Sequence, residues 1–181
     1  MQFLNLSVLL TLAASVSAVD ISLRAWGNCD SRGGGVTCTN KNPNSCCGVP
    51  TGSYSSTVIY AVPGDWSLEF RGHEGGNCGR VKNSAAFRGG EYCLGGGPFT
   101  GAGYSFVSKK RRGEQAQEGT CSASGACTGT VAPDQLFLAD GQKYNIVDME
   151  TGLFEELHGL MQNGSVKADI PAVFKTFEIS A

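Results

Sequence analysis

The fold is decided by a segment that opens with CDSRGGGVTCTNKNPNSCC, residues 29–47, and ends at Cys93. Two strand-like runs follow the adjacent pair Cys46-Cys47 within this segment. The segment holds six of the eight cysteines, namely Cys29, Cys38, Cys46, Cys47, Cys78 and Cys93. We therefore expect a disulfide-stapled β-rich unit with the remaining chain packed around it.

The first 18 residues carry no Lys, Arg, Asp or Glu, and their apolar middle ends in small residues up to Ala18. This pattern predicts a secretory signal peptide over residues 1–18. The apolar run is shorter than the roughly 20 residues that a membrane-spanning helix needs. We expect one secreted, extracellular domain over residues 19–181, with no membrane span and no partner subunit.

An even number of cysteines in a secreted chain predicts four disulfides. Cys121 and Cys127 flank a short flexible segment, so a bond between them would close a local loop, and the other pairings stay open. Cys46 and Cys47 are expected to reach different partners, because a ring across one peptide bond is strained. No C-x-x-C pair occurs and the chain has only two histidines, which argues against a metal site, and we expect no cofactor.

Charge is unevenly distributed over the chain. Residues 1–118 hold 11 basic and 8 acidic side chains, and residues 119–181 hold 3 and 8. This pattern lacks the concentrated basic face that binding to nucleic acid requires. The basic run Lys109, Lys110, Arg111 and Arg112 favours a solvated polar loop around residues 109–130. The alternative is a dibasic cleavage site for a kexin-type processing protease.

The middle of the chain predicts short strands separated by glycine-rich loops. Apolar alternation and β-branched residues favour strands over Ile21–Trp26, Ser56–Val62, Trp66–Phe70, Tyr92–Leu94 and Tyr104–Ser108. Residues 27–50 and 72–79 are expected to be loops, and Pro63-Gly64-Asp65 a turn.

The C-terminal part changes from strand to helix periodicity. Leu136–Val147 predicts a hairpin whose Asp140-Gly141 forms a type I′ turn. Glu150–Gln162 then predicts a helix that is capped by Asp148 and ends at Asn163-Gly164. Val173–Ile179 is expected to be the last strand. Asn163-Gly164-Ser165 is also an N-glycosylation sequon, which would place the helix end at the surface.

Two resemblances follow from these residues. Trp66-x-x-x-Phe70-x-Gly72 resembles the folded hairpin of a βγ-crystallin-type Greek key, and the similarity covers residues 23–79. It implies a Greek-key sandwich, but Thr51-Gly52 stand where that family's calcium signature needs acidic residues, so calcium is not implied. By its signal, cysteine count and glycine content, the whole chain is similar to the small cysteine-rich proteins that fungi secrete.

Catalytic candidates are few. Glu69, His73 and Glu74 cluster near the predicted hairpin, and an acid–base pair among them would suit cleavage of a glycosidic bond. Glu155 and His158 lie three apart on the predicted helix, where an ordinary surface ion pair is expected. The aromatic residues Trp26, Tyr54, Trp66 and Tyr104 are expected in the core; exposed together, they would stack on sugar rings.

These observations favour a mainly β, disulfide-stapled fold with one helix around residues 150–162. No Gly-x-Ser-x-Gly elbow or phosphate-binding loop occurs. We expect a non-enzymatic extracellular factor of the effector, antimicrobial toxin or inhibitor type, which binds an unknown protein or glycan target. Toxins and inhibitors are implied by the βγ-crystallin resemblance. The alternative is a small secreted hydrolase acting on a cell-wall polysaccharide.

Overall fold

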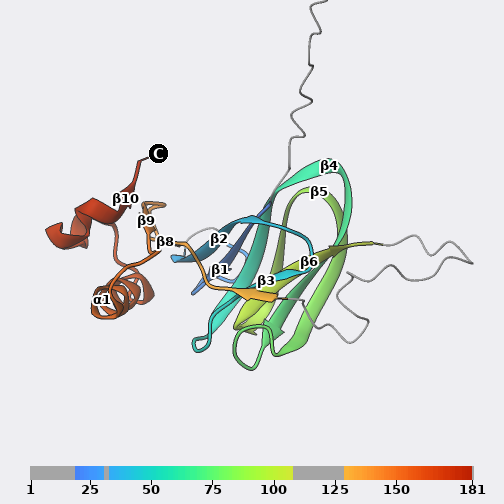
Figure 1. Cartoon of the computed structure of the whole chain (residues 1–181), viewed down its shortest axis with the longest axis horizontal. Coiled ribbons are helices and arrows are strands. Elements are labelled where there is room, and N and C mark those ends of the chain that lie inside the picture. Colours follow the sequence, from blue (N-terminus) through green and yellow to red (C-terminus); the bar gives the residue numbers. More distant parts are fainter. Residues whose placement is uncertain (1–18, 31–32, 108–128, 181) are drawn as a thin grey trace, which may run out of the picture.

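The computed structural model describes residues 19–30, 33–107 and 129–180 (Figure 1). The part so described is mainly β with one α-helix, as the sequence predicts. In chain order its elements are β1 Val19–Arg24, β2 Gly35–Lys41, β3 Ser45–Gly48, β4 Tyr54–Glu74, β5 Arg80–Phe99, β6 Gly101–Phe106, β7 Gly129–Val131, β8 Gln135–Phe137, β9 Lys143–Asn145, α1 Thr151–Gln162, the 3-10 helices η1 Lys167–Asp169 and η2 Ala172–Phe177, and β10 Glu178–Ile179.

The long hairpin of β4 and β5 organises the sheet. β5 pairs along one edge of β4, while the other edge pairs with β1 through residues 56–60 and with β6 through residues 68–73. The full strand order is β10-β9-β8-β2-β1-β4-β6-β3-β7, with β5 beside β4. One continuous sheet therefore links the first strand of the described chain to the last. This order does not by itself establish a Greek key, which stays a prediction.

A bend in the middle of the hairpin curls the sheet around its core (Figure 1). Ala61 has a φ of 57°, and the pairing of β4 with β5 is irregular between Ile59 and Ser67. The predicted turn at Pro63-Gly64-Asp65 is thus wrong, because the chain bends there within one strand instead of reversing. Side chains from both halves of β4, such as Ile59 and Phe70, then share one buried cluster.

Glycine-rich segments were the main source of error in the sequence prediction. Residues 27–50 contain β2 and β3, and β5 extends far beyond the predicted strand Tyr92–Leu94. Gly35 gives the physical reason, since a Cβ atom there would lie 2.8 Å from Cζ of Phe137 and 3.0 Å from the carbonyl carbon of Leu23. Glycine at this position allows close packing of neighbouring strands and does not mark a loop.

The C-terminal hairpin forms as predicted, but its turn differs. β8 pairs with β9, and β8 also pairs with β2, which joins the hairpin to the main sheet. A type I′ turn needs positive φ at both central residues, whereas only Gly141, at 88°, has it here. The predicted strand Val173–Ile179 is also wrong, since η2 occupies most of it and only β10 is extended.

Helix α1 confirms the predicted helix and its end. The amide of Gly164 donates to the carbonyl of Met161, and that of Ser165 donates to the carbonyl of Leu160, which is a Schellman motif. The helix does not begin at Asp148 as predicted, because Glu150 is its N-cap residue and makes no side-chain cap. Leu157 and Met161 of α1 are fully buried in the same cluster as the sheet residues.

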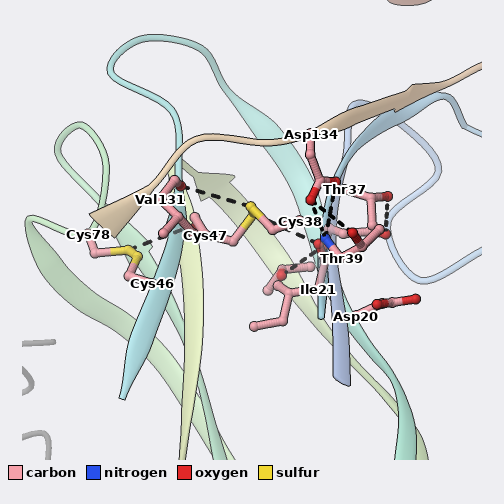
Figure 2. Close-up of a disulfide and its surroundings, with 12 residues drawn as sticks. Asp20, Ile21, Thr37, Cys38, Thr39, Cys46, Cys47, Cys78, Val131 and Asp134 are labelled. Carbon is pink, nitrogen blue, oxygen red and sulfur yellow. Dashed lines mark hydrogen bonds between the residues drawn. A yellow bond between two sulfur atoms is a disulfide. The ribbon is translucent and has the colours of Figure 1, made fainter. Parts of the chain in front are cut away.

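Six cysteines stand in three pairs, two of which meet at β3 (Figure 2). Cys47 pairs with Cys38 at a Cα–Cα distance of 5.8 Å, and Cys46 pairs with Cys78 at 6.3 Å. Adjacent cysteines of one strand thus point in opposite directions, as β geometry requires. The third pair, Cys29–Cys93, has a Cα–Cα distance of 5.8 Å. Cys121 and Cys127 lie outside the described residues.

Candidate functional site

An apolar cleft lies between the β body and helix α1. Its volume is about 530 Å³, and its walls come from β2, the segment after β3, the start of β4, the segment after β7 and one face of α1. The lining residues are Val36, Gly48, Val49, Pro50, Thr51, Tyr54, Ala132, Pro133, Ile146, Thr151, Phe154, Glu155, His158 and Gly159. A mostly apolar cleft of this size with a few convergent polar groups is the usual form of a binding site.

Two polar side chains meet at the cleft. Oη of Tyr54, at the start of β4, lies 3.1 Å from Nε2 of His158 on α1. The side-chain nitrogen of Gln162 lies 3.4 Å from the same Nε2 atom. The ring of Phe154 stacks on the imidazole with 5.5 Å between ring centroids. These contacts fix His158 against the β body although Tyr54 is distant in sequence.

The protonation of this pair follows from its burial. Burial raises the pKa of the Tyr54 hydroxyl far above its usual value and lowers the pKa of His158. Tyr54 therefore keeps its proton and His158 is neutral near pH 7. The amide nitrogen of Gln162 can only donate, so its contact with Nε2 favours the tautomer with the imidazole proton on Nδ1, in which Nε2 also accepts from Tyr54. The pair presents a neutral, directional polar group to a ligand.

The charge at the cleft comes from Glu155, which lines it and is exposed. The ion pair that we expected between Glu155 and His158 does not form; the histidine bonds to Tyr54 and Gln162 instead. Within the described residues Glu155 makes no ion pair. The cleft therefore combines an apolar interior, a neutral hydrogen-bonding pair and an unpaired carboxylate.

The three residues of the hydrolase hypothesis are placed differently. Glu69 pairs with Arg71, and Glu74 pairs with Arg80 at 2.8 Å and with Lys82 at 3.1 Å. The side chain of His73 is fully buried, and among the residues that the structure describes neither of its ring nitrogens has a hydrogen-bond partner. Glu69, His73 and Glu74 do not line the cleft described above.

Burial and the nearby charge of Arg71 lower the pKa of His73 to about 4. Its ring is therefore neutral near pH 7, but it has no access to solvent. Acid–base catalysis needs a group within hydrogen-bonding reach of a substrate, and His73 does not have this access in the structure.

The other predicted sites are placed as follows. Asn163 is exposed at the end of α1, where a sequon is accessible, and its glycosylation stays a prediction. Lys109–Arg112 and the signal segment 1–18 lie outside the described residues. Of the four aromatic residues, Tyr54 and Tyr104 are buried in the core as expected, Trp66 is partly buried against it, and Trp26 is 45% exposed. Among the residues that the structure describes, no three potential metal ligands come together.

Sequence reasoning missed the site because its two halves are far apart in the chain. Tyr54 and His158 are separated by 104 residues, and nothing in either local pattern points to the other. The only local signal was a histidine on an otherwise apolar helix face, beside Leu157 and Met161. Such a residue is half-buried when the helix packs, and it then needs a polar partner from the surface it covers.

Two family models match this chain and together cover most of it. The model of the ARB_05566 N-terminal domain matches residues 20–134, and that of the C-terminal domain matches residues 139–181. The cleft is built from both matched regions, since Tyr54 lies in the first and His158 in the second.

A relative from Arthroderma benhamiae (strain ATCC MYA-4681 / CBS 112371), described as an uncharacterized secreted protein, is 30% identical over 111 residues. The match covers 59% of this chain and 54% of the relative, so the chain spans about half the length of that protein. No solved structure matches.

The protein is secreted, as the sequence predicts and as the description of the relative agrees. In the described part of the chain, no helix has the length and apolar character needed to cross a membrane. Neither comparison names a crystallin, so the βγ-crystallin resemblance stays a prediction.

Proposed function

The chain belongs to the ARB_05566 family, and from that premise we propose that it is a non-enzymatic extracellular factor that binds a target in the α1 cleft. The observation that supports this most is the cleft of about 530 Å³, with its apolar walls and the Tyr54–His158 pair. A preformed apolar cleft reduces the entropy that binding costs, because its walls are already ordered by packing.

The chemistry of the cleft favours a basic segment of an extracellular protein with an apolar side chain as its anchor. Val49, Ile146 and Phe154 offer an apolar surface for that side chain. Glu155 would attract a neighbouring lysine or arginine of the target, because it has no cation of its own in the described residues. Effector, antimicrobial toxin and inhibitor roles, the last two also implied by the βγ-crystallin resemblance, all fit such binding.

The hydrolase alternative, acting on a cell-wall polysaccharide, has less support. Both of its carboxylates are engaged with cations and its histidine is enclosed. A steady release of reducing sugar from cell-wall polymers, abolished by Glu69→Gln and Glu74→Gln, would favour the hydrolase and contradict a purely binding role.

The binding proposal is tested with two neighbouring glutamates of α1. Glu155 lines the cleft, whereas Glu156 is exposed on the same helix but does not line it. We would screen the secreted protein against an array of peptides that combine an aromatic or leucine residue with lysine or arginine. The affinity for bound peptides is then measured for Glu155→Lys and Glu156→Lys.

We expect Glu155→Lys to weaken binding by about tenfold or more, because it replaces attraction by repulsion, while Glu156→Lys changes it little. Equal effects of both substitutions would show that only the overall charge matters and would refute the cleft as the binding site. An array without any peptide hit, together with binding to neutral glycans, would refute the proposed class of target.

A further inference from the structure

A second cavity, of about 430 Å³, lies on the face of β1 and β2 opposite the core. Ile21 and Leu23 of β1 point into the core, so Ser22 and Arg24 point to this other face. Outward-facing residues of a sheet are usually exposed, yet Ser22, Arg24 and Thr37 are all buried here. The structure therefore encloses a polar surface.

Three residues that line this cavity belong to one row across four strands. Lys143 of β9 lies opposite Phe137 of β8, Phe137 lies opposite Gly35 of β2, and Gly35 lies opposite Arg24 of β1. Residues that are directly opposite share a face of the sheet. The ring of Phe137 lies directly over Gly35. A Cβ atom on residue 35 would come within 2.8 Å of Cζ of Phe137, so a larger residue would displace the ring. Arg24 and Lys143 thus lie in one row of the sheet on either side of Phe137, and all three line the cavity.

Arg24 is the central residue of the cavity. Its side chain extends toward Tyr60, with the guanidinium carbon 5.9 Å from the ring centroid, and Nη2 donates to the Tyr60 hydroxyl. The residue is only 9% exposed, and its Nε atom has no hydrogen-bond partner within residues 19–30, 33–107 and 129–180. No carboxylate of the described residues lies within ion-pair distance of it. A buried guanidinium without a counter-ion is unfavourable unless an anion completes the site.

We propose that this cavity binds a hydroxylated carboxylate, such as a uronic acid, with Arg24 as the cation that holds the carboxylate and Lys143 as a second positive charge in the cavity wall. Arginine presents a planar set of donors that matches a carboxylate. Lys143 is exposed and makes no ion pair in the described part of the chain, so its ammonium group is available.

The remaining lining groups select the body of the ligand. Ser22 and Thr37 hold each other through hydroxyls 2.7 Å apart and keep lone pairs for a hydroxylated ligand. Asp20 also lines the cavity, so its carboxylate can accept hydrogen bonds from hydroxyl groups of the ligand and would repel a second negative charge on it. Phe137 offers an apolar surface to a sugar ring. This set favours a monoanionic sugar over an inorganic dianion, and it is separate from the α1 cleft.

The test measures binding of galacturonate, galactose and inorganic phosphate to the full secreted chain by titration calorimetry. We expect saturable binding of galacturonate that weakens with added salt, and no binding of galactose. Absence of galacturonate binding would overturn the proposal. Phosphate binding as tight as that of galacturonate would overturn the assignment of a carboxylate ligand.

Variants locate the binding. Lys143→Gln is expected to weaken galacturonate binding severalfold, because it removes a positive charge from the cavity wall, and Arg24→Gln by about tenfold or more, because it removes the charge-assisted contact to the carboxylate. Lys175→Gln is the matched control, because Lys175 is exposed and does not line the cavity. Arg24→Gln is scored only after circular dichroism shows a native fold. If Arg24→Gln does not fold, Lys143→Gln decides the test, because it changes an exposed residue. Unchanged affinity in Lys143→Gln would refute the site.

Discussion

Acidification from pH 7 to pH 4 is expected to destabilise the protein mainly through one buried residue, His73. Its side chain is 0% exposed, and neither Nδ1 nor Nε2 has a hydrogen-bond partner in the described part of the chain. Burial, followed by the charge of Arg71, lowers the pKa of His73 from 6.5 to about 4. The folded protein therefore resists protonation of this ring until the pH is far below the point at which an unfolded chain takes up the proton.

The sign and size of the effect follow from proton linkage. Between the unfolded pKa and the folded pKa, the unfolded state binds more protons, so the free energy of unfolding falls as the pH decreases. A difference of about 2.5 pKa units, at about 1.4 kcal/mol each, gives a loss of about 3 kcal/mol between pH 7 and pH 4. The stabilising contribution is fully present above pH 6.5.

Urea denaturation of the wild type, His73→Leu and His158→Gln at pH 7, 5.5 and 4 provides the assay. His73→Leu is expected to remove most of the pH dependence and to cost little at pH 7, because no hydrogen bond is lost. His158→Gln should remove a further part, since burial also lowers the pKa of His158. The chain has only these two histidines. A His73→Leu variant with the wild-type slope would refute the reasoning.

Three other predictions concern packing, cross-links and modification. Leu157→Ala should lower the free energy of unfolding by about 2–5 kcal/mol in urea, because the residue is fully buried, while its exposed neighbour Glu156→Ala should change it by less than about 0.5 kcal/mol. Replacement of Cys29 and Cys93 by serine, which opens a loop of 64 residues, should cost about 4 kcal/mol in the same measurement. Mass spectrometry of protein secreted by a eukaryotic host should show a glycan on Asn163 that glycosidase treatment removes, and an unshifted mass would exclude it. The same spectrum shows whether the chain is cleaved at Lys109–Arg112.

Local sequence patterns were sufficient to predict the elements that are stabilised mainly by contacts between nearby residues, namely the helix and the C-terminal hairpin. The 3.6-residue periodicity of residues 150–162 correctly predicted helix α1, whose buried residues are Leu157 and Met161. The hairpin around Gly141 followed from its turn residues. Glycine-rich segments were not predictable in this way, because Gly35 serves the approach of distant strands and that need is invisible in its neighbours.

The candidate site depends on contacts between distant residues, which no local pattern encodes. Tyr54 was expected in the core and is buried, but its hydroxyl bond to His158 depends on how α1 docks. Arg24 likewise looked like the polar position of an alternating strand. Only the pairing of β1, β2, β8 and β9 places it in an enclosed cavity near Lys143.

The pairing of β8 with β2 bears on how this family can be dissected. The matched regions end at residue 134 and resume at residue 139, so β8, Gln135–Phe137, lies in neither. A fragment that ends at residue 134 would lack β8, which pairs with Gly35–Thr37 of β2. The exposed edge of β2 would then be free to pair with another copy of the fragment. A recombinant fragment of the first region should therefore extend at least through β8. This strand lies between the two matched regions and pairs with β2 of the first and β9 of the second.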